Sequence, residues 1–177
     1  EEHREPKRAR TEDTDNFVND RNSFDCYPVG DFQIELLNEI PDSSECDGTG
    51  GVVWEAGATL ADFIYSNRKT LGMNCVDVIE IGSGSGLVGI AASLSGSPRV
   101  ILSDLAPLVP NLERNIDQNS SKLTGRVEAA CLDWSSVDSS PLRASFDLVL
   151  GADLLYDSNN GTGPSRMYSK LARAILA

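Results

Sequence analysis

A glycine-rich segment constrains the fold of this chain more than any other part of its sequence. It reads EIGSGSGLVG over residues 80–89, with glycines at positions 82, 84, 86 and 89. An apolar run over residues 76–81 predicts a strand before it, and the apolar spacing over residues 87–94 predicts a helix after it. A strand that turns through glycines directly into a helix is typical of ligand-binding loops in parallel-sheet proteins. Glycine is needed there because the turn takes unusual backbone angles and the ligand packs against bare main chain.

The glycine spacing excludes two phosphate-binding loops. A dinucleotide loop, G-x-G-x-x-G, would need glycine where Leu87 stands, and no Gly-Lys-Ser/Thr follows to form a P-loop. Glu80 would repel a pyrophosphate, whereas it could bind an ammonium group. Asp104 ends the next predicted strand, where a carboxylate can hold ribose hydroxyls. A ligand with an amino acid at one end and a ribose at the other would suit all three features. S-adenosylmethionine is such a ligand, and we predict it as the cofactor. A glycine turn without a ligand is the alternative.

Predicted strands and helices alternate through most of the chain. The strands occupy residues 76–81, 100–103, 126–132 and 146–152, and the helices occupy residues 87–94, 109–119 and 165–176. Pro110 suits the first turn of the second of these helices. Such alternation implies a parallel sheet covered by helices on both faces. The predicted fold class is therefore α/β, with a doubly wound, mostly parallel sheet of the Rossmann-like kind.

The residues before the glycine loop are less regular. Residues 32–36 alternate between apolar and polar and predict a half-buried strand, and residues 41–51 predict a loop. From Val53 to about Gly72 the spacing is helical.

We also expect particular side chains to face the core. The strand over residues 146–152 is apolar on both faces, as in the middle of a parallel sheet. In the helices before and after the sheet, the predicted inward side chains are Leu60, Phe63, Ile64, Leu171, Ile175 and Leu176.

Length and composition fit one domain with an ordinary core. The chain has 177 residues, of which 40% are hydrophobic and 24% charged. We expect a disordered tail over residues 1–22, a strand-and-loop extension over residues 23–51, and a cofactor-binding domain over residues 52–177. No apolar run approaches the ~18 residues that span a bilayer, and no signal peptide is visible. We expect a cytoplasmic protein, with the nucleus as a second location if the basic run over residues 7–10 directs import.

The charge is unevenly spread. The formal net charge is −12, and residues 11–50 hold eleven acids against Arg21 alone. Such a surface would repel a phosphate backbone, so we expect no nucleic acid and no membrane as partners. It could favour a basic protein substrate, although an acidic segment can also be merely solvated.

The cysteine spacing matches no zinc pattern. The chain contains Cys26, Cys46, Cys75 and Cys131, and its single histidine, His3, lies in the predicted tail. We therefore predict no metal site. Cys75 and Cys131 fall in apolar runs, where we expect them to be small core residues.

Five motifs follow one another along the chain: Val53-Trp54-Glu55, Glu80 to Ile90, Ser103-Asp104, Leu132-Asp133-Trp134 and Asp147 to Asp157. The last contains Asp153-Leu-Leu-Tyr156, an Asp-x-x-Tyr pattern. In this order the motifs resemble those of the seven-strand S-adenosylmethionine-dependent methyltransferases, and the resemblance covers roughly residues 50–177. Within these enzymes, the sequence looks most like the protein-lysine methyltransferase group related to the chaperone, calmodulin and valosin-containing-protein methyltransferases (methyltransferase-like family 16), which has the Asp-x-x-Tyr pattern.

The resemblance implies a role for each matching residue. Asp104 would hold the cofactor's ribose, while Trp134 would flank the adenine and Asp133 would contact its N6. Trp54 would line the methionine side. Asp153 and Tyr156 would be the catalytic residues, facing the incoming lysine. The implied cofactor-binding set is Trp54, Glu80, Gly82, Ser83, Gly84, Gly86, Asp104, Asp133, Trp134 and Ala152.

Methyl transfer from a sulfonium is an in-line displacement that needs a neutral amine. For a lysine with a pKa of ~10.4, neutrality at pH 7 costs about 4.6 kcal/mol. A nearby carboxylate raises that pKa, so Asp153 is better suited to orient the amine or relay its proton than to act as a strong base. We expect Tyr156 to form a hydrogen bond that narrows the pocket.

Other interpretations stay open at this point. The resemblance implies further strands after the helix that ends near residue 176. Without them, the strand over residues 146–152 would be an unpaired edge of the sheet, so we expect a fragment whose own activity is in question, with a partner chain that covers this edge as the alternative. We expect the full-length protein to be a monomer. A non-catalytic cofactor-binding adaptor would need neither Asp153 nor Tyr156. Another acceptor, such as a protein histidine or a small molecule, is a further alternative. The acceptor favoured by the resemblance is a protein, such as a chaperone or a translation-related protein.

Overall fold

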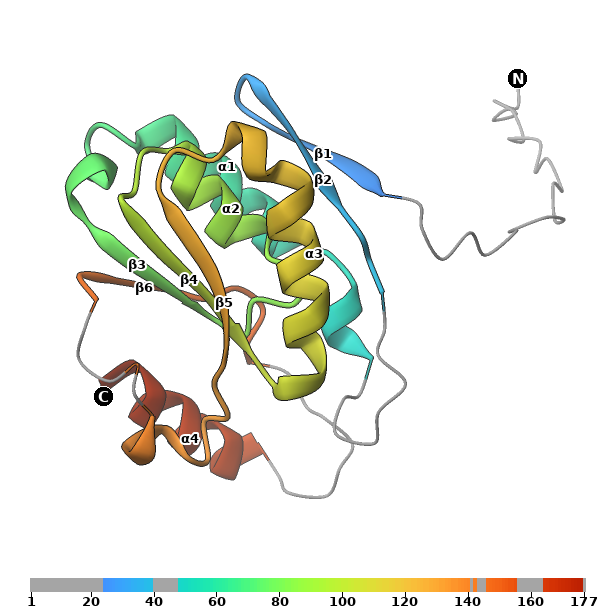
Figure 1. Ribbon diagram of the computed structural model, residues 1–177. Helices are drawn as coiled ribbons and strands as arrows, with labels where there is room; N and C mark the ends of the chain where they lie inside the picture. Colours follow the sequence, from blue (N-terminus) through green and yellow to red (C-terminus); the bar gives the residue numbers. More distant parts are fainter. Residues whose placement is uncertain (1–23, 40–47, 141, 143–145, 156–163, 177) are drawn as a thin grey trace, which may run out of the picture.

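The structure is a computed structural model, described here over residues 24–39, 48–140, 142, 146–155 and 164–176. The predicted tail over residues 1–22 lies outside these residues. Figure 1 shows a twisted sheet with helices on both sides and a hairpin outside one helical layer. Among the described residues, no helix is long and apolar enough to cross a membrane.

The sheet has four parallel strands. In spatial order they are β5 (Arg126–Cys131), β4 (Arg99–Asp104), β3 (Asp77–Ile81) and β6 (Leu148–Leu150). The chain moves outward from β3 to β4 and β5, then crosses back to pair β6 with the other edge of β3. The predicted parallel α/β sheet is confirmed. Because the strand order reverses beside β3, the carboxyl end of β3 lies where open α/β sheets bind ligands.

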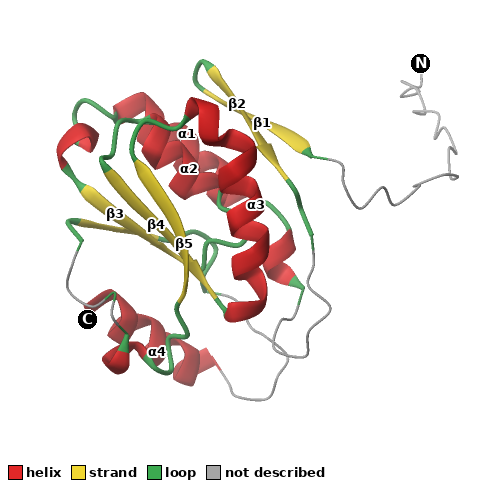
Figure 2. Ribbon diagram, viewed as in Figure 1, coloured by secondary structure: helices red, strands yellow, loops and turns green. Residues whose placement is uncertain are grey.

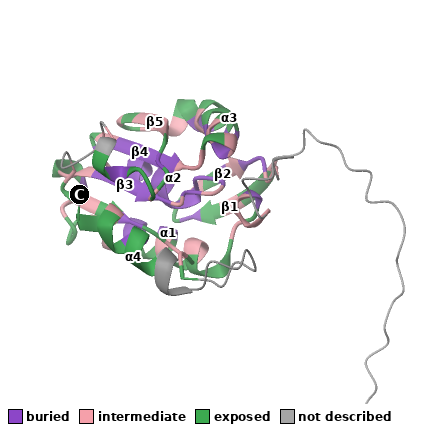
Figure 3. Ribbon diagram, turned by 90° about the horizontal axis from the view of Figure 1, so that it is seen from below, coloured by how far each residue is buried: buried purple, intermediate pink, exposed green. Residues whose placement is uncertain are grey.

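Helices cover both faces of this sheet. Three helices, α1 (Glu55–Asn67), α2 (Leu87–Leu94) and α3 (Val109–Asn119), share one face with Val78 and Val100. On the other face, α4 (Pro164–Leu176) packs through Leu171 against Ile79, Ile81 and Ile101 (Figure 2). Neighbouring strand residues therefore point to opposite cores, which is why these strands are apolar throughout. Figure 3 shows the deepest burial along β3, β4 and α2.

Short 3-10 turns connect these elements. They are η1 (Thr49–Gly51), η2 (Met73–Cys75), η3 (Ala106–Leu108), η4 (Ser120–Lys122) and η5 (Val137–Ser139).

An antiparallel hairpin forms a third layer outside the helices. The predicted strand is β2 (Phe32–Leu36), and its partner β1 (Asp25–Val29) was not predicted. A two-residue turn, Gly30-Asp31, joins them, with Gly30 at a φ of 55°. Gly-Asp between two apolar segments is itself a hairpin signal, so β1 could have been found. The hairpin packs its apolar face on α1, α2 and α3 (Figure 1).

Several predicted inward side chains are exposed instead. Phe63 is 53% exposed because α1 packs on its neighbours through Ala61, Ile64 and Tyr65. Among the α4 side chains that the structure describes (residues 168–176), only Leu171 is buried, whereas Leu176 is 86% exposed. Ile175 is also exposed. The helices themselves were predicted correctly, but the prediction of which side chains face the core was wrong for these three positions.

Two further predictions concern the strand ends and the sheet edge. Among the described residues, β6 pairs only with β3 and forms an edge of the sheet, so the expected unpaired edge is confirmed, and Val149 is exposed. The prediction for Cys75 and Cys131 is wrong, because both are exposed rather than core residues. Cys75 lies in the turn before β3, and Cys131 ends the outermost strand, β5.

The hairpin turn generates a stability prediction. A Cβ on Gly30 would lie 1.8 Å from the ring of Tyr65, whereas a Cβ on Gly72, whose φ is also positive, meets nothing within 4 Å. We expect Gly72→Ala to lower the free energy of unfolding by about 1 kcal/mol through backbone strain alone. We expect Gly30→Ala to lower it by about 3 kcal/mol, since overpacking is added to the same strain. Urea denaturation of both variants measures this, and equal losses would contradict the packing argument.

Candidate active site

The glycine loop begins where β3 ends and leads into α2. Gly82, Gly84 and Gly86 have φ values of 64°, 55° and 88°, a left-handed region that other residues adopt only with strain. Gly86 is the residue before the first turn of α2, and its N–H donates to the Ser83 carbonyl at 2.8 Å. The predicted need for glycine at these three positions is therefore confirmed.

Neighbouring segments approach the bare backbone of this loop closely. A Cβ on Gly82 would lie 2.5 Å from Leu154 and 3.4 Å from the Trp134 ring. A Cβ on Gly84 would lie 3.0 Å from the Gly50 carbonyl oxygen. Glycine is therefore required at both positions, because other segments of this chain pack directly against the main chain of the loop. Sequence analysis missed Gly50 and Leu154, because nothing in a loop or strand pattern indicates which distant segment lies over it.

Asp104 fastens the glycine loop to the end of β4. Its Oδ2 accepts a hydrogen bond from the Gly84 N–H at 2.7 Å, and its Oδ1 accepts one from the Leu105 N–H at 2.7 Å. Each carboxylate oxygen can accept more than one hydrogen bond. Asp104 therefore lies beside the loop, and its predicted contact with a ribose stays a prediction.

Glu80 lies beneath the first turn of α2. The side chain is buried, and its Oε2 accepts a hydrogen bond from the Gly89 N–H at 2.9 Å. The pKa of Glu80 is raised to about 8, mainly by burial; the hydrogen bonds to Gly89 and Ser83 lower it and the nearby Asp104 charge adds to the rise. A Cβ on Gly89 would lie 2.8 Å from this carboxylate, so the carboxylate needs glycine there. The predicted contact with an ammonium group stays a prediction.

Residues after β5 approach the loop from a second side. Trp134 is partly buried, packs on the core shared with α4, and lies beside Gly82. Asp133 is exposed, and its Oδ1 accepts a hydrogen bond from the Ser135 N–H at 2.7 Å. The structure thus brings Trp134 to the glycine loop, while Asp133 faces solvent within its own turn.

An open groove lies between α1 and the residues after β6. Trp54, directly before α1, is 51% exposed, and its indole N–H donates to the Thr49 carbonyl at 3.0 Å. The methyl group of Ala152 lies 4.0 Å from a Cβ on Gly57, so the strand end touches α1. The groove is lined by Trp54, Glu55, Ala56, Thr59, Leu60, Phe63 and Asp153.

Asp153 has an unusual backbone. It is exposed and its φ is 53°, a region that Asp tolerates better than most residues but still with strain. Among the described residues, the Asp153 side chain has no hydrogen-bond partner, and it lines the groove. Such an outlier beside a groove favours a functional role. The other predicted catalytic residue, Tyr156, lies outside the described residues.

No group of three possible metal ligands occurs among the described His, Cys, Asp and Glu side chains. A glycine loop and an acidic strand end that meet beside the first strand of a parallel sheet define a small-ligand site of the Rossmann-like class.

The comparisons with known proteins identify the family. Residues 37–164 match the family described as lysine methyltransferase, so this chain belongs to that family. It is 38% identical over 123 residues to the Bos taurus protein-lysine methyltransferase METTL21E, covering 67% of this chain and 42% of that protein. It is 34% identical over 109 residues to the Mus musculus EEF1A lysine methyltransferase 3, covering 62% and 45%. The chain thus spans about half the length of the curated relatives it matches.

A solved structure was also found. The magnesium protoporphyrin IX methyltransferase of Synechocystis PCC 6803, with bound SAH, aligns with a TM-score of 0.48 and 18% identity, covering 66% of this chain and 50% of that one.

Burial of Glu80 generates a pH prediction. A carboxyl group whose pKa is raised from 4.5 to about 8 holds a proton that the unfolded chain releases, so stability falls as pH rises through that window. Glu80→Gln keeps an oxygen for the Gly89 N–H but does not titrate. Between pH 5 and 8, we expect the free energy of unfolding of wild type to fall by about 4 kcal/mol more than that of Glu80→Gln. Denaturation at several pH values tests this, with the exposed Glu113→Gln as the control. A difference that does not change with pH would contradict it.

Proposed function

We propose that this chain is the cofactor-binding part of an S-adenosylmethionine-dependent methyltransferase that acts on a lysine side chain of a protein. The observation that carries the proposal is the meeting of the glycine loop, Asp104 and Trp134 at the carboxyl end of β3. Family membership supports the reaction, and relatives named as protein-lysine and EEF1A lysine methyltransferases support a protein acceptor.

The residues present suit this cofactor. Gly82 and Gly84 leave main chain bare for its methionine end, and the N–H groups at the start of α2 favour a carboxylate. Asp104 would accept hydrogen bonds from the ribose hydroxyls. Trp134 would pack on the adenine, beside Gly82. When bound, the cofactor supplies a methyl group carried on a sulfonium.

The groove beside α1 suits an amine acceptor. Its apolar lining includes the exposed rings of Trp54 and Phe63, which would pack along a lysine stem and exclude water from it. Its charged residues are the carboxylates Glu55 and Asp153. A carboxylate stabilises an ammonium and so opposes its deprotonation. Asp153 therefore orients the amine towards the methyl donor, and its exposure gives the released proton a path to water.

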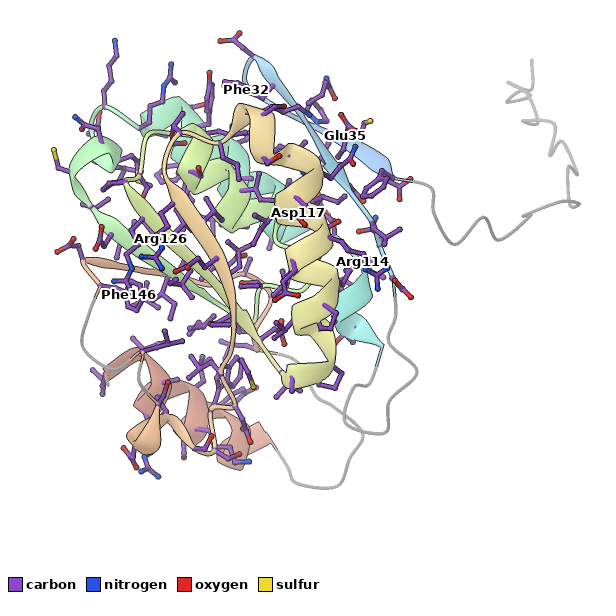
Figure 4. All side chains as sticks on the ribbon, viewed as in Figure 1. Phe32, Glu35, Arg114, Asp117, Arg126 and Phe146 are labelled. Carbon is purple, nitrogen blue, oxygen red and sulfur yellow. The ribbon has the colours of Figure 1, made fainter. Side chains whose placement is uncertain are left out.

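Calorimetric titration with S-adenosylhomocysteine tests the cofactor assignment. We expect wild type to bind and Asp104→Ala to bind at least about tenfold more weakly, because charge-assisted hydrogen bonds to the ribose are lost. The matched control is Asp117→Ala, which removes an exposed carboxylate from α3 (Figure 4) and should leave affinity unchanged. A folded wild-type chain that does not bind S-adenosylhomocysteine would refute the proposal for this chain.

Methylation of a lysine-peptide array separates the acceptor role from cofactor binding. We expect Asp153→Ala to lower the methylation rate by about a hundredfold, since a misaligned amine loses much of the benefit of orientation, while the affinity for S-adenosylhomocysteine stays within about twofold. Asp62→Ala, an exposed acid on α1 that does not line the groove, is the control. Equal losses of methylation and cofactor affinity in Asp153→Ala would contradict this division of roles.

A further inference from the structure

Three asparagines recur at four-residue intervals on one face of α3. Asn111, Asn115 and Asn119 are all buried, and Asn115 and Asn119 are 0% exposed. Burying an amide is unfavourable unless its hydrogen bonds are replaced. Sequence analysis did not predict this face, because a polar residue in a helix is normally assigned to solvent. The face lies against the hairpin, between β2 and the glycine loop.

Asn115 and Asn119 bond to the main chain of β2 and the residue after it much as a neighbouring strand would. The Leu37 N–H donates to Asn115 Oδ1 at 2.7 Å, and Asn115 Nδ2 donates to the Leu37 carbonyl at 3.2 Å. The Glu35 N–H donates to Asn119 Oδ1 at 3.1 Å, and Asn119 Nδ2 donates to the Glu35 carbonyl at 2.7 Å. Two residues along a strand advance about 6.6 Å and four along a helix about 6 Å, so the two patterns match.

Charged side chains surround these amide pairs. Glu35 points from β2 towards α3 and contacts Gln118 and Lys122, and Arg114 forms an ion pair with Glu39 at 2.7 Å (Figure 4). The hairpin is thus fixed to α3 along its length.

Of the three buried asparagines, only Asn115 also bonds to the glycine loop. Its Nδ2 also donates to the Ser85 carbonyl at 2.8 Å, and Ser85 lies between Gly84 and Gly86. Both amide hydrogens of Asn115 are therefore used, one on the hairpin and one on the loop. The second donor of Asn119 bonds instead to the Asn115 carbonyl, within α3. The two amides are alike in burial and in their bonds to the hairpin, and they differ in the loop contact.

We propose that Asn115 is a positioning residue for the cofactor loop, and that it couples docking of the β1–β2 hairpin to cofactor binding. This inference rests on the proposed cofactor. A loop with glycine at three of five positions is conformationally free, and ordering it opposes binding. The bond to Ser85 removes part of that freedom before the cofactor arrives, and the hairpin fixes the Asn115 amide that makes the bond. Coupling between two sites is reciprocal, so the cofactor also stabilises the docked hairpin.

Calorimetry with S-adenosylhomocysteine on two matched variants tests the loop contact. Asn115→Ala and Asn119→Ala each remove a pair of bonds to the hairpin, but only Asn115→Ala removes the bond to Ser85. Near-ultraviolet circular dichroism first sets a temperature at which both variants are folded. We expect the dissociation constant to rise about tenfold in Asn115→Ala and less than about threefold in Asn119→Ala. Equal weakening in both variants, or none in Asn115→Ala, overturns the positioning role.

Amide hydrogen exchange on wild type tests the coupling without any variant. We expect saturating S-adenosylhomocysteine to slow exchange of the Leu37 and Glu35 amides, which bond to Asn115 and Asn119. Unchanged exchange at these amides, with the cofactor analogue bound, overturns the coupling. If wild type does not bind the analogue, the proposed function fails and the coupling fails with it. If it binds and the variants behave alike, only this inference fails.

Discussion

The site depends on the pairing of β3 along both of its edges. β4 pairs with one edge and β6 with the other, so the residues that end all three strands meet at one place. Asp104 leaves β4 there, Asp153 follows β6, and the glycine loop leaves β3 between them. The acidic residues on the two sides of β3 make different contacts. On the β4 side, the Asp104 carboxylate bonds to main-chain N–H groups, whereas on the β6 side the exposed Asp153 carboxylate lines a groove together with apolar rings.

Sequence analysis predicted best where local chemistry decides the structure. The bounds of α2 and α3 agree with prediction, because glycines fix the start of one and Pro110 suits the first turn of the other. The prediction failed where distant packing decides. Phe63 is exposed, because apolar spacing shows that a helix has an inner face without showing its rotation. Leu154 over Gly82 and Asn115 beside Ser85 join residues far apart in the chain, and no periodic pattern reports such a pair.

Buried and partly buried polar side chains around the glycine loop act through hydrogen bonds to the main chain. Glu80 accepts a hydrogen bond from an N–H in the first turn of α2, and Asp104 accepts one from an N–H of the loop. Asn115, on α3, donates a hydrogen bond to a carbonyl of the loop. Each group replaces water at a main-chain atom that the fold has buried, which offsets its own desolvation. The loop is consequently fixed at several points although its sequence is flexible. A glycine-rich loop needs such hydrogen bonds from other segments to be rigid, because glycine has no side chain that could restrict its own main chain.

The hairpin joins its supporting helix across a long stretch of chain. The bonds from Asn115 and Asn119 to the hairpin span 78 and 84 residues. The hairpin cannot make these bonds until α3 has been synthesised. Ribosomes add about 5–20 residues per second, so the bonds form at the earliest roughly 4–16 s after the hairpin's own synthesis. During that interval the part of its apolar face that α3 covers in the folded chain is exposed, which makes this segment prone to aggregation in the nascent chain.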